Sequence, residues 1–524
     1  MNLKNLLLSV AVIAATPLFA TTYYVSPEGA GTKDGSSWEN AFGVEEFRTK
    51  AADNVNGDVY NFAGGVYKPS QTVVFKVETG ATLNGNADGE RTIFSGDKNG
   101  NNNPDSVDAN RLIRFQANTV DGISTKSIVI QDIDFTCVYT NCNDNSATMG
   151  ALMIDNSGDV KINNCNFYGN WAQGQFGGAG CFIYRSTVVL TKCVFHNNSA
   201  NYRGAAVRVF GNSTEKGLVT FDDCTFKNNT NYHNMGIIFG ANFKQINLIN
   251  CTVADNKING TEKAGAIFVN PKATYDNKLT IVNSTIAGNT PSQISFNGKG
   301  AYTNIVNSVI TGVAGTNVID FAADEDFTNV TSGGYNYVGP MGVEAIAPAT
   351  RAEEEEEETA AKINWLETDN VSAENTYASI FGENKINSDN VIVPVKYFAG
   401  ASGEQVADAT KGWELPEGVN VKVDQNGTER TEGMMPGAYA ITQKDIDGTT
   451  VSVINVIDDA ANAPRLVKVA NGVYTVEGAT EGVTAYTVNG ATVAATSGNT
   501  IDLSSFANGL YIIKSGNAIF KVMK

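Results

Sequence analysis

Side chains that commonly catalyse reactions are few in this sequence and fall in segments with turn character. The two histidines are His196 and His233, and the adjacent carboxylates Asp222 and Asp223 stand between two apolar segments. Paired acids can hydrolyse a glycosidic bond when they flank it, but aspartate is also a favoured turn residue. We therefore interpret Asp222 and Asp223 as a turn and both histidines as solvent-exposed turn residues, and we assign no catalytic residue.

Metal ligands are also sparse. Two histidines in one region make a histidine-rich zinc site improbable on composition, and the seven cysteines form no C-x-x-C pair. The run TRAEEEEEET at 350–359 is a block of like charge that repels itself, whereas calcium loops alternate their ligands. We interpret this run as an exposed loop or linker and predict no metal site.

Aromatic residues in the turns offer the more distinctive surface chemistry. Rings with polar tips suit wet binding surfaces and can stack on sugar rings. The alternative is that these rings only cover the flank of the fold. The basic residues Arg185, Arg203 and Arg208 are interpreted as a solvated face, with a basic site for an acidic sugar as the alternative. The candidate ligand-binding residues are Trp171, Phe176, Tyr202, Arg203, Tyr232 and His233.

These residues lie in a repeat that extends from about 128 to 312. Apolar residues recur five and three positions before a reference position and two positions after it, with polar residues between them, and a period of two indicates strands with one buried face. Val160, Val188 and Val219 form one such buried column. The reference positions are Ile133, Cys165, Cys193, Cys224, Cys251, Ser284 and Ser308.

A further strand precedes each unit and follows a Gly-Ala pair, as in GALMI, AGCFI and GAIFV. Three short strands and three turns per repeat predict one coil of a right-handed parallel β-helix, in which stacked coils share one core. We expect the first strand to place Phe182 and Arg208 outward, together with Leu152, Ile154 and Ile238. We expect the third strand to point Asp134, Asn166, Val194, Thr225, Thr252 and Thr285 outward, so that no two neighbouring coils supply a carboxylate pair.

Two further columns accompany the strands. Asparagine recurs five residues after the reference position, and we predict an asparagine ladder at a turn, because asparagine tolerates the left-handed conformation and its amide can bond along a stack. Four cysteines share the reference column, which we interpret as a ladder of free thiols, with disulfides between stacked coils and a Cys137–Cys142 bridge as alternatives. The ladder residues are Asn170, Asn198, Asn229, Asn256 and Asn289.

Composition excludes some classes of protein. The 524 residues include 37 Lys and Arg against 55 Asp and Glu, so the net charge is −18 and the pI is about 4.6. Nucleic-acid binding needs a basic patch, so no nucleic-acid partner is expected. No apolar run in the body of the chain reaches 18 residues, which predicts no transmembrane helix in the mature chain.

The first twenty residues have the pattern of a secretory signal. Lys4 precedes the apolar run LLLSVAVIAATPLF, and Ala20 ends a suitable cleavage site. The run is short for a membrane anchor, which is the alternative interpretation. We therefore predict secretion through the Sec pathway, with a mature chain that starts near Thr21.

Several segments resemble known families. The pairing of F-x-x-N, as in FYGN and FHNN, with strands such as GGAGCFI resembles the chlamydial polymorphic outer-membrane protein repeat. TYYVSPEGAGTKDGSSWENAF is similar to the cap of secreted β-helix proteins of the pectin-lyase-like superfold, and DQNGTER with PGAYA resembles their closing segment. The segment IDLSSFANGLYIIK resembles the C-terminal sorting domain of the type IX secretion system of Bacteroidota, which implies a small β-sandwich.

The resemblances imply a division of the chain. The fold class is all-β, a right-handed parallel β-helix followed by a small C-terminal β-sandwich. The segments are a signal peptide at 1–20, a cap and first coils at 21–127, repeat coils at 128–340, an acidic insertion and closing coils at 341–440, a linker at 441–454 and the sorting domain at 455–524.

The function that we expect is a non-catalytic adhesin or a glycan-binding scaffold, extracellular or attached to the outer-membrane surface. Its partners would be polysaccharides or surface glycans of host or bacterium, together with the type IX secretion machinery. The resemblance leaves a polysaccharide lyase or glycoside hydrolase as one alternative and a structural stalk as another, because the superfold does not determine activity. No cofactor is expected, and Ca²⁺ would be needed only by a lyase.

Overall fold

The structure is a computed structural model of the chain. It describes residues 20–523 except for 56, 87–88, 118–121, 142–149, 176, 213–215, 234, 260–263, 272–276, 299–300, 322–327, 342–362, 444, 447–464, 471, 480, 488–490, 508 and 517. The described part divides into two compact units, the described residues of 20–393 with 398–440 and those of 394–397 with 441–523. Each unit is described by itself.

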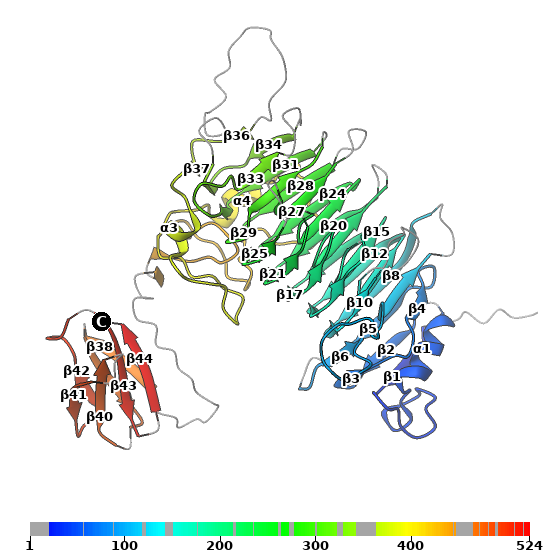
Figure 1. Ribbon diagram of the computed structural model, residues 1–524, viewed down its shortest axis with the longest axis horizontal. Helices are drawn as coiled ribbons and strands as arrows, with labels where there is room; N and C mark the ends of the chain where they lie inside the picture. Colours follow the sequence, from blue (N-terminus) through cyan, green and yellow to red (C-terminus); the bar gives the residue numbers. More distant parts are fainter. Residues whose placement is uncertain are drawn as a thin grey trace, which may run out of the picture. The chain divides into compact units, whose positions relative to one another are not determined.

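The first unit is a parallel β-solenoid whose strands stack coil upon coil (Figure 1). Over the described residues its strands form parallel sheets of twelve, eleven, nine and five strands. The twelve-stranded sheet contains β1 (Thr22–Val25), β2 (Val59–Phe62), β5 (Ala81–Asn84), β8 (Ser124–Gln131), β12 (Ser157–Asn163), β16 (Thr187–Thr191), β20 (Leu218–Asp222), β24 (Gln245–Ile249), β28 (Asn277–Val282), β31 (Ala301–Val306), β34 (Thr328–Ser332) and β36 (Ile363–Asn364).

The other three sheets complete each coil. The eleven-stranded sheet contains β3 (Gly65–Tyr67), β6 (Thr92–Ser95), β9 (Ile133–Thr136), β13 (Asn166–Tyr168), β17 (Val194–His196), β21 (Thr225–Lys227), β25 (Thr252–Ala254), β29 (Thr285–Ala287), β32 (Val309–Thr311), β35 (Tyr337–Gly339) and β37 (Asn370–Val371). The nine-stranded sheet contains β4 (Val73–Lys76), β7 (Ile113–Gln116), β11 (Leu152–Asp155), β15 (Cys181–Tyr184), β19 (Val207–Phe210), β23 (Ile238–Ala241), β27 (Gly265–Asn270), β30 (Ser292–Phe296) and β33 (Ile319–Phe321). The five-stranded sheet contains β10 (Tyr139–Thr140), β14 (Trp171–Ala172), β18 (Ser199–Ala200), β22 (Thr230–Asn231) and β26 (Lys257–Ile258).

The buried columns predicted from the repeat are confirmed. Val160 pairs with Val188, and Val188 pairs with Val219, and all three side chains are buried. Phe135, Phe167, Phe195 and Phe226 stack with their ring centroids 4.7–4.9 Å apart. That distance matches the spacing of neighbouring strands, so one ring per coil fills the interior without a gap.

The cysteine column lies inside the solenoid. The thiols of Cys193, Cys224 and Cys251 each approach a backbone carbonyl of the preceding coil, at 3.3–3.4 Å. Complete burial raises the pKa of Cys165, Cys193 and Cys224 well above the usual value, so these thiols stay protonated. The six described cysteines are free, and Cys142 lies outside the described residues, as does therefore the predicted Cys137–Cys142 bridge.

The asparagine ladder exists, but its conformation was predicted wrongly. The ladder amides are buried, and the left-handed backbone belongs to the residue before each of them, such as Asn197 (φ 55°) before Asn198 and Asn228 (φ 55°) before Asn229. The turn thus needs two residues in series. The first takes the strained backbone, and the second turns its amide into the core to bond backbone groups that no strand pairs.

The strands of the nine-stranded sheet face differently from our prediction at several positions. Leu152, Ile154 and Ile238 belong to the main core and point inward. Phe182 and Arg208 do point outward, in a register column with Met153, Phe239 and Phe268. The Gly-Ala segments that precede these strands vary in length, and a slip of one residue moves a side chain to the other face.

A helix closes the N-terminal end of the solenoid core. The helix α1 (Val44–Ala52) follows the short 3-10 helix η1 (Trp38–Asn40). The buried ring of Phe47 meets Phe62 edge-on at 5.0 Å and Tyr60 edge-on at 5.2 Å. These contacts shield the first coil, whose apolar interior no earlier coil covers.

The part of the first unit that follows β37, residues 372–393 and 398–440, packs along the outside of the later coils, where it includes the helices α3 (Tyr377–Phe381) and α4 (Gly403–Ala409) (Figure 1). We call it the closing segment. Ile249, Val282 and Val306 pack against it, whereas uncovered coils have the polar residues Asn163 and Thr191 in the same register column. Ala254 and Ala287 likewise lie under α3, in the column that holds Tyr168 and His196 in earlier coils. These outward residues therefore indicate whether the closing segment covers a coil: they are apolar where it does and polar where it does not.

The second unit is a small antiparallel β-sandwich, as predicted. One sheet contains β38 (Arg465–Ala470), β39 (Val473–Glu477) and β42 (Thr500–Asp502), and the other contains β40 (Val483–Thr487), β41 (Thr492–Thr496), β43 (Leu510–Ser515) and β44 (Ala518–Met523). Its core is separate and includes Tyr474, Val476, Val483, Ile513 and Val522. The described residues contain no helix that is long and apolar enough to cross a bilayer.

Candidate functional site

Three of the predicted ligand-binding residues lie together after β18 and β22. The ring of Tyr202 stacks on the imidazole of His233 with centroids 4.1 Å apart and planes 7° apart. Tyr232 is 49% exposed, and His233 is also exposed as predicted. We call Tyr202, Tyr232 and His233 the aromatic edge.

Hydrogen bonds from a buried asparagine hold the backbone of this edge. The Asn231 amide donates to the carbonyls of Tyr202 and Gly236, and its Oδ1 accepts from the backbone N–H of His233 at 2.9 Å. Asn231 thereby ties two successive coils together beneath the rings. The rings are held by backbone geometry as well as by stacking, which lowers the entropy that a ligand would have to remove.

The remaining three predicted residues do not join this edge in the described contacts. Trp171 lies on β14, pairs with Ser199 of the next coil, and meets Tyr139 edge-on at 5.6 Å. Arg203 turns toward the nine-stranded sheet, where its guanidinium lies 6.0 Å from the ring of Phe239. Phe176 lies outside the described residues.

The outward face of the nine-stranded sheet carries aromatic rings beside guanidinium groups. The guanidinium of Arg208 lies 4.8 Å from the ring of Phe182 and 5.5 Å from that of Phe210. Tyr184 stacks on Phe210 at 5.8 Å, and Arg185 lies over Tyr184 at 4.5 Å. The interpretation of these arginines as a solvated face is wrong for Arg208, which is 3% exposed.

Asp222 and Asp223 form the predicted turn, with Asp223 in the left-handed conformation (φ 55°). Burial raises the pKa of Asp222 to about 6, and burial together with the charge of Asp222 raises that of Asp223 to about 7. The amide of Gln425 in the closing segment donates to the carbonyl of Asp223 at 3.1 Å. The pair therefore lies beneath the closing segment and has a structural role at this turn.

His196 is not the exposed turn residue that we predicted. It lies on β17, is half-buried, and stacks on Tyr168 with centroids 5.0 Å apart. Burial lowers the pKa of His196, and the charge of Lys227 lowers it further. The lowered pKa favours the neutral imidazole at physiological pH.

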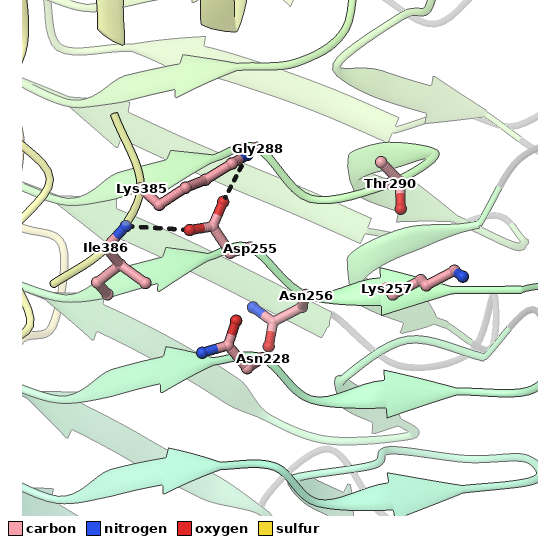
Figure 2. Close-up of a pocket in the computed structure, with 8 residues that line it drawn as sticks. All are labelled: Asn228, Asp255, Asn256, Lys257, Gly288, Thr290, Lys385 and Ile386. Atoms are coloured by element: carbon pink, nitrogen blue, oxygen red, sulfur yellow. Dashed lines mark hydrogen bonds and ion pairs between the residues drawn. The ribbon is translucent and has the colours of Figure 1, made fainter. Parts of the chain in front are cut away.

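An open pocket of about 490 Å³ lies where the closing segment meets the turns of the later coils (Figure 2). Figure 2 shows Lys385 and the backbone N–H of Ile386 converging on the carboxylate of Asp255, at 3.3 and 3.0 Å. Lys257 and Thr290 lie at the other end of the pocket. Asp255 is the only carboxylate among the lining residues, and it already binds Lys385 and Ile386 of the closing segment. We therefore assign no catalytic role to this pocket.

No group of three or more metal-ligating side chains gathers within the described residues. The acidic run at 350–359 lies outside them.

Known proteins resemble the chain in fold. Residues 105–273 match the family model described as right handed beta helix region. Among solved structures, one described as a glycoside hydrolase is 8% identical, with a TM-score of 0.33 over 68% of this chain and 96% of that chain, a likeness that supports no inference about activity. No curated protein matches the chain.

Proposed function

We propose that this chain is an exported β-helix protein, displayed on the cell surface or released, that binds glycans as an adhesin or scaffold and does not cleave them. The observation that supports this proposal is the aromatic edge, where Tyr202 stacks on His233 and the ring of the preceding residue, Tyr232, is exposed. Flat rings with polar tips bind sugar rings by stacking and by hydrogen bonds at their edges. Polysaccharides and surface glycans are therefore the proposed partners.

The proposal is tested with the purified full chain on a glycan array and in a polysaccharide digestion assay. Tyr202→Ala and Tyr232→Ala should each weaken glycan binding about tenfold, the loss that one or two stacking contacts would give. Tyr302→Ala is the matched control, because Tyr302 is 43% exposed but lies on the twelve-stranded sheet. Binding that all three variants weaken equally contradicts the assignment of the site.

The same assays decide between the alternatives. Release of sugar fragments would support a polysaccharide lyase or glycoside hydrolase, and stimulation by Ca²⁺ would favour the lyase. A chain that neither binds nor digests any glycan would be a structural stalk. Either result overturns the proposed binding function.

We further propose that residues 1–20 direct Sec export and that the second unit is the sorting domain of the type IX secretion system. The support is the resemblance of IDLSSFANGLYIIK to such domains, together with a β-sandwich that has its own core. Deletion of residues 455–524 in a type IX-competent bacterium should leave the protein in the periplasm. Unchanged surface exposure after this deletion, followed by protease accessibility on intact cells, would exclude the sorting role.

A further inference from the structure

Arginine residues lie on and beside the nine-stranded sheet although the chain is acidic. Five of the ten arginines in the sequence fall between residues 111 and 208, while the whole chain has a net charge of −18. Arg114 of β7 and Arg208 of β19 share one outward column of this sheet. Among the described residues of β7, β11, β15, β19 and β23 in this sheet, Asp155 of β11 is the one carboxylate.

Three side chains from successive coils have buried polar atoms that find no hydrogen-bond partner among the described residues. They are Nε of Arg114, Oδ1 of Asp155 and Nε of Arg185, while each side chain as a whole stays partly exposed. The strands pair so that Arg114 precedes Asp155 by one coil, and Arg185 follows Tyr184, which pairs with Asp155. Folded proteins satisfy the great majority of buried polar atoms, so three unpaired atoms in one place indicate a missing partner.

The order of Arg114, Asp155 and Arg185 along the coils indicates the chemistry of a ligand that would pair with them. Two guanidinium donors flank one carboxylate acceptor over two coil spacings, about 10 Å. Burial raises the pKa of Asp155, and the charges of Arg114 and Arg185 oppose that rise. The guanidinium groups suit an oxyanion, and the carboxylate suits a hydroxyl next to it.

Aromatic rings lie beside these three side chains and restrict the chemistry of the ligand further. Phe182 and Tyr184 lie in the coil after Asp155, their ring centroids are 5.8 Å apart, and the half-buried Tyr184 stacks on Phe210 of the next coil. A ligand on this face therefore meets charged donors and ring surface together. A simple inorganic anion would use the donors but not the rings, whereas a sugar presents hydroxyls and an apolar ring face at once.

We infer that Arg114, Asp155 and Arg185 form a second binding site, distinct from the aromatic edge, for a saccharide that has a carboxylate or sulfate group next to a free hydroxyl. The site lies on the nine-stranded sheet and shares no residue with Tyr202, Tyr232 or His233. It does not require the proposed binding of glycans at the aromatic edge.

Dextran, carboxymethyl-dextran and dextran sulfate test this inference, because they share one backbone and differ in the anionic group. Binding to the full chain is measured by calorimetry at fixed ionic strength. We expect both charged polymers to bind and neutral dextran not to bind, and the stronger of the two identifies the preferred anion. Arg114→Gln and Arg185→Gln should each weaken binding about tenfold, the loss of one charge-assisted contact.

Controls separate a built site from general attraction between charges. Arg48→Gln removes an arginine of α1 that pairs with Glu45, and it should leave the affinity unchanged. Asp155→Asn keeps an acceptor and removes a negative charge, so it should retain or strengthen binding, whereas Asp155→Leu should weaken it. Tyr232→Ala should have no effect, which distinguishes this site from the aromatic edge.

Equal losses in Arg48→Gln and Arg114→Gln, or no binding of either charged polymer, would overturn the inference. Circular dichroism on each variant identifies loss of fold, and Arg114→Lys, which keeps the charge, should retain part of the affinity if the site is present.

Discussion

The amide Nδ2 of Asn198 donates to Oδ1 of Asn229 across 3.0 Å, and this bond joins two successive coils inside the solenoid. The same Nδ2 donates to the carbonyl of Phe167, and Oδ1 of Asn229 also accepts from the backbone N–H of Asn198. The ladder therefore satisfies the backbone at a turn that lies between two sheets. The side-chain amide of each of these asparagines donates to the asparagine of the next coil, so loss of one asparagine leaves the preceding one without that acceptor.

Asn229→Leu should destabilise the first unit strongly, because it leaves the amide of Asn198 and the carbonyl of Phe195 without their partner. We expect a loss of about 3 kcal/mol, from several buried groups left unpaired. Urea denaturation followed by circular dichroism measures it. Thr230→Ala, at the next and half-buried position, is the control and should cost less than about 1 kcal/mol.

Gly177 is required because the next coil approaches its backbone closely. A Cβ at this position would lie 1.6 Å from the carbonyl oxygen of Arg203. Gly177→Ala should therefore prevent correct stacking of these coils and greatly reduce the yield of soluble protein. Gly509→Ala is the control, because nothing lies within 4 Å of its Cβ position. Equal yields of the two variants would contradict the described approach of the coils.

The carboxylates Asp222 and Asp223 should make stability depend on pH. Their folded pKa values of about 6 and about 7 exceed the ordinary value of about 3.9, so the folded state holds more protons than the unfolded state between about pH 4 and pH 7. Their contribution to stability therefore falls as the pH rises through this window.

Asp223→Asn removes one of these titrations and keeps the turn, since Asn164 and Asn250 adopt the same left-handed backbone in other coils. We expect the variant to be more stable than the native chain by about 1 kcal/mol at pH 8 and nearly equal to it at pH 5. Thermal denaturation at the two pH values measures the difference. A difference that is the same at both pH values would mean that Asp223 does not titrate in this range.

Val282→Asp should release the closing segment. Val282 is buried and packs in a cluster with Ala401, Val406 and Val421, and a carboxylate there would lose its water without gaining a partner. Limited proteolysis should then cut the chain near α4, at sites that the native protein protects. Thr191→Asp is the matched control, because Thr191 occupies the same register column in an uncovered coil. Cleavage in both variants would contradict a local effect.

The repeat pattern was sufficient to predict the solenoid. The alternation around Val160, Val188 and Val219 defines strands with one buried face, and its recurrence places these residues over one another, as the pairing confirms. The phenylalanine, cysteine and asparagine columns follow from the same alignment. They were predictable because each coil repeats the same local pattern with the same partner above and below.

The pocket at Asp255 was less predictable than the aromatic edge, since it depends on the closing segment, which lies outside the repeat. The sequence around Asp255 does not predict its ion pair with Lys385, which lies 130 residues later in the chain. The apolar residues Ile249, Val282 and Val306 did give a signal, because they break an otherwise polar column, and that break marks the coils covered by the closing segment.

The sequence by itself determined the class of fold, the inward columns of the twelve- and eleven-stranded sheets and the turn at Asp222–Asp223, because short-range periodicity decides which side chains of a strand share a face. Only the tertiary structure decided that Arg114, Asp155 and Arg185 gather on one sheet and that Tyr202 stacks on His233. These residues come from different coils, and their proximity depends on the register between coils, which loops of unequal length set and which local periodicity does not encode.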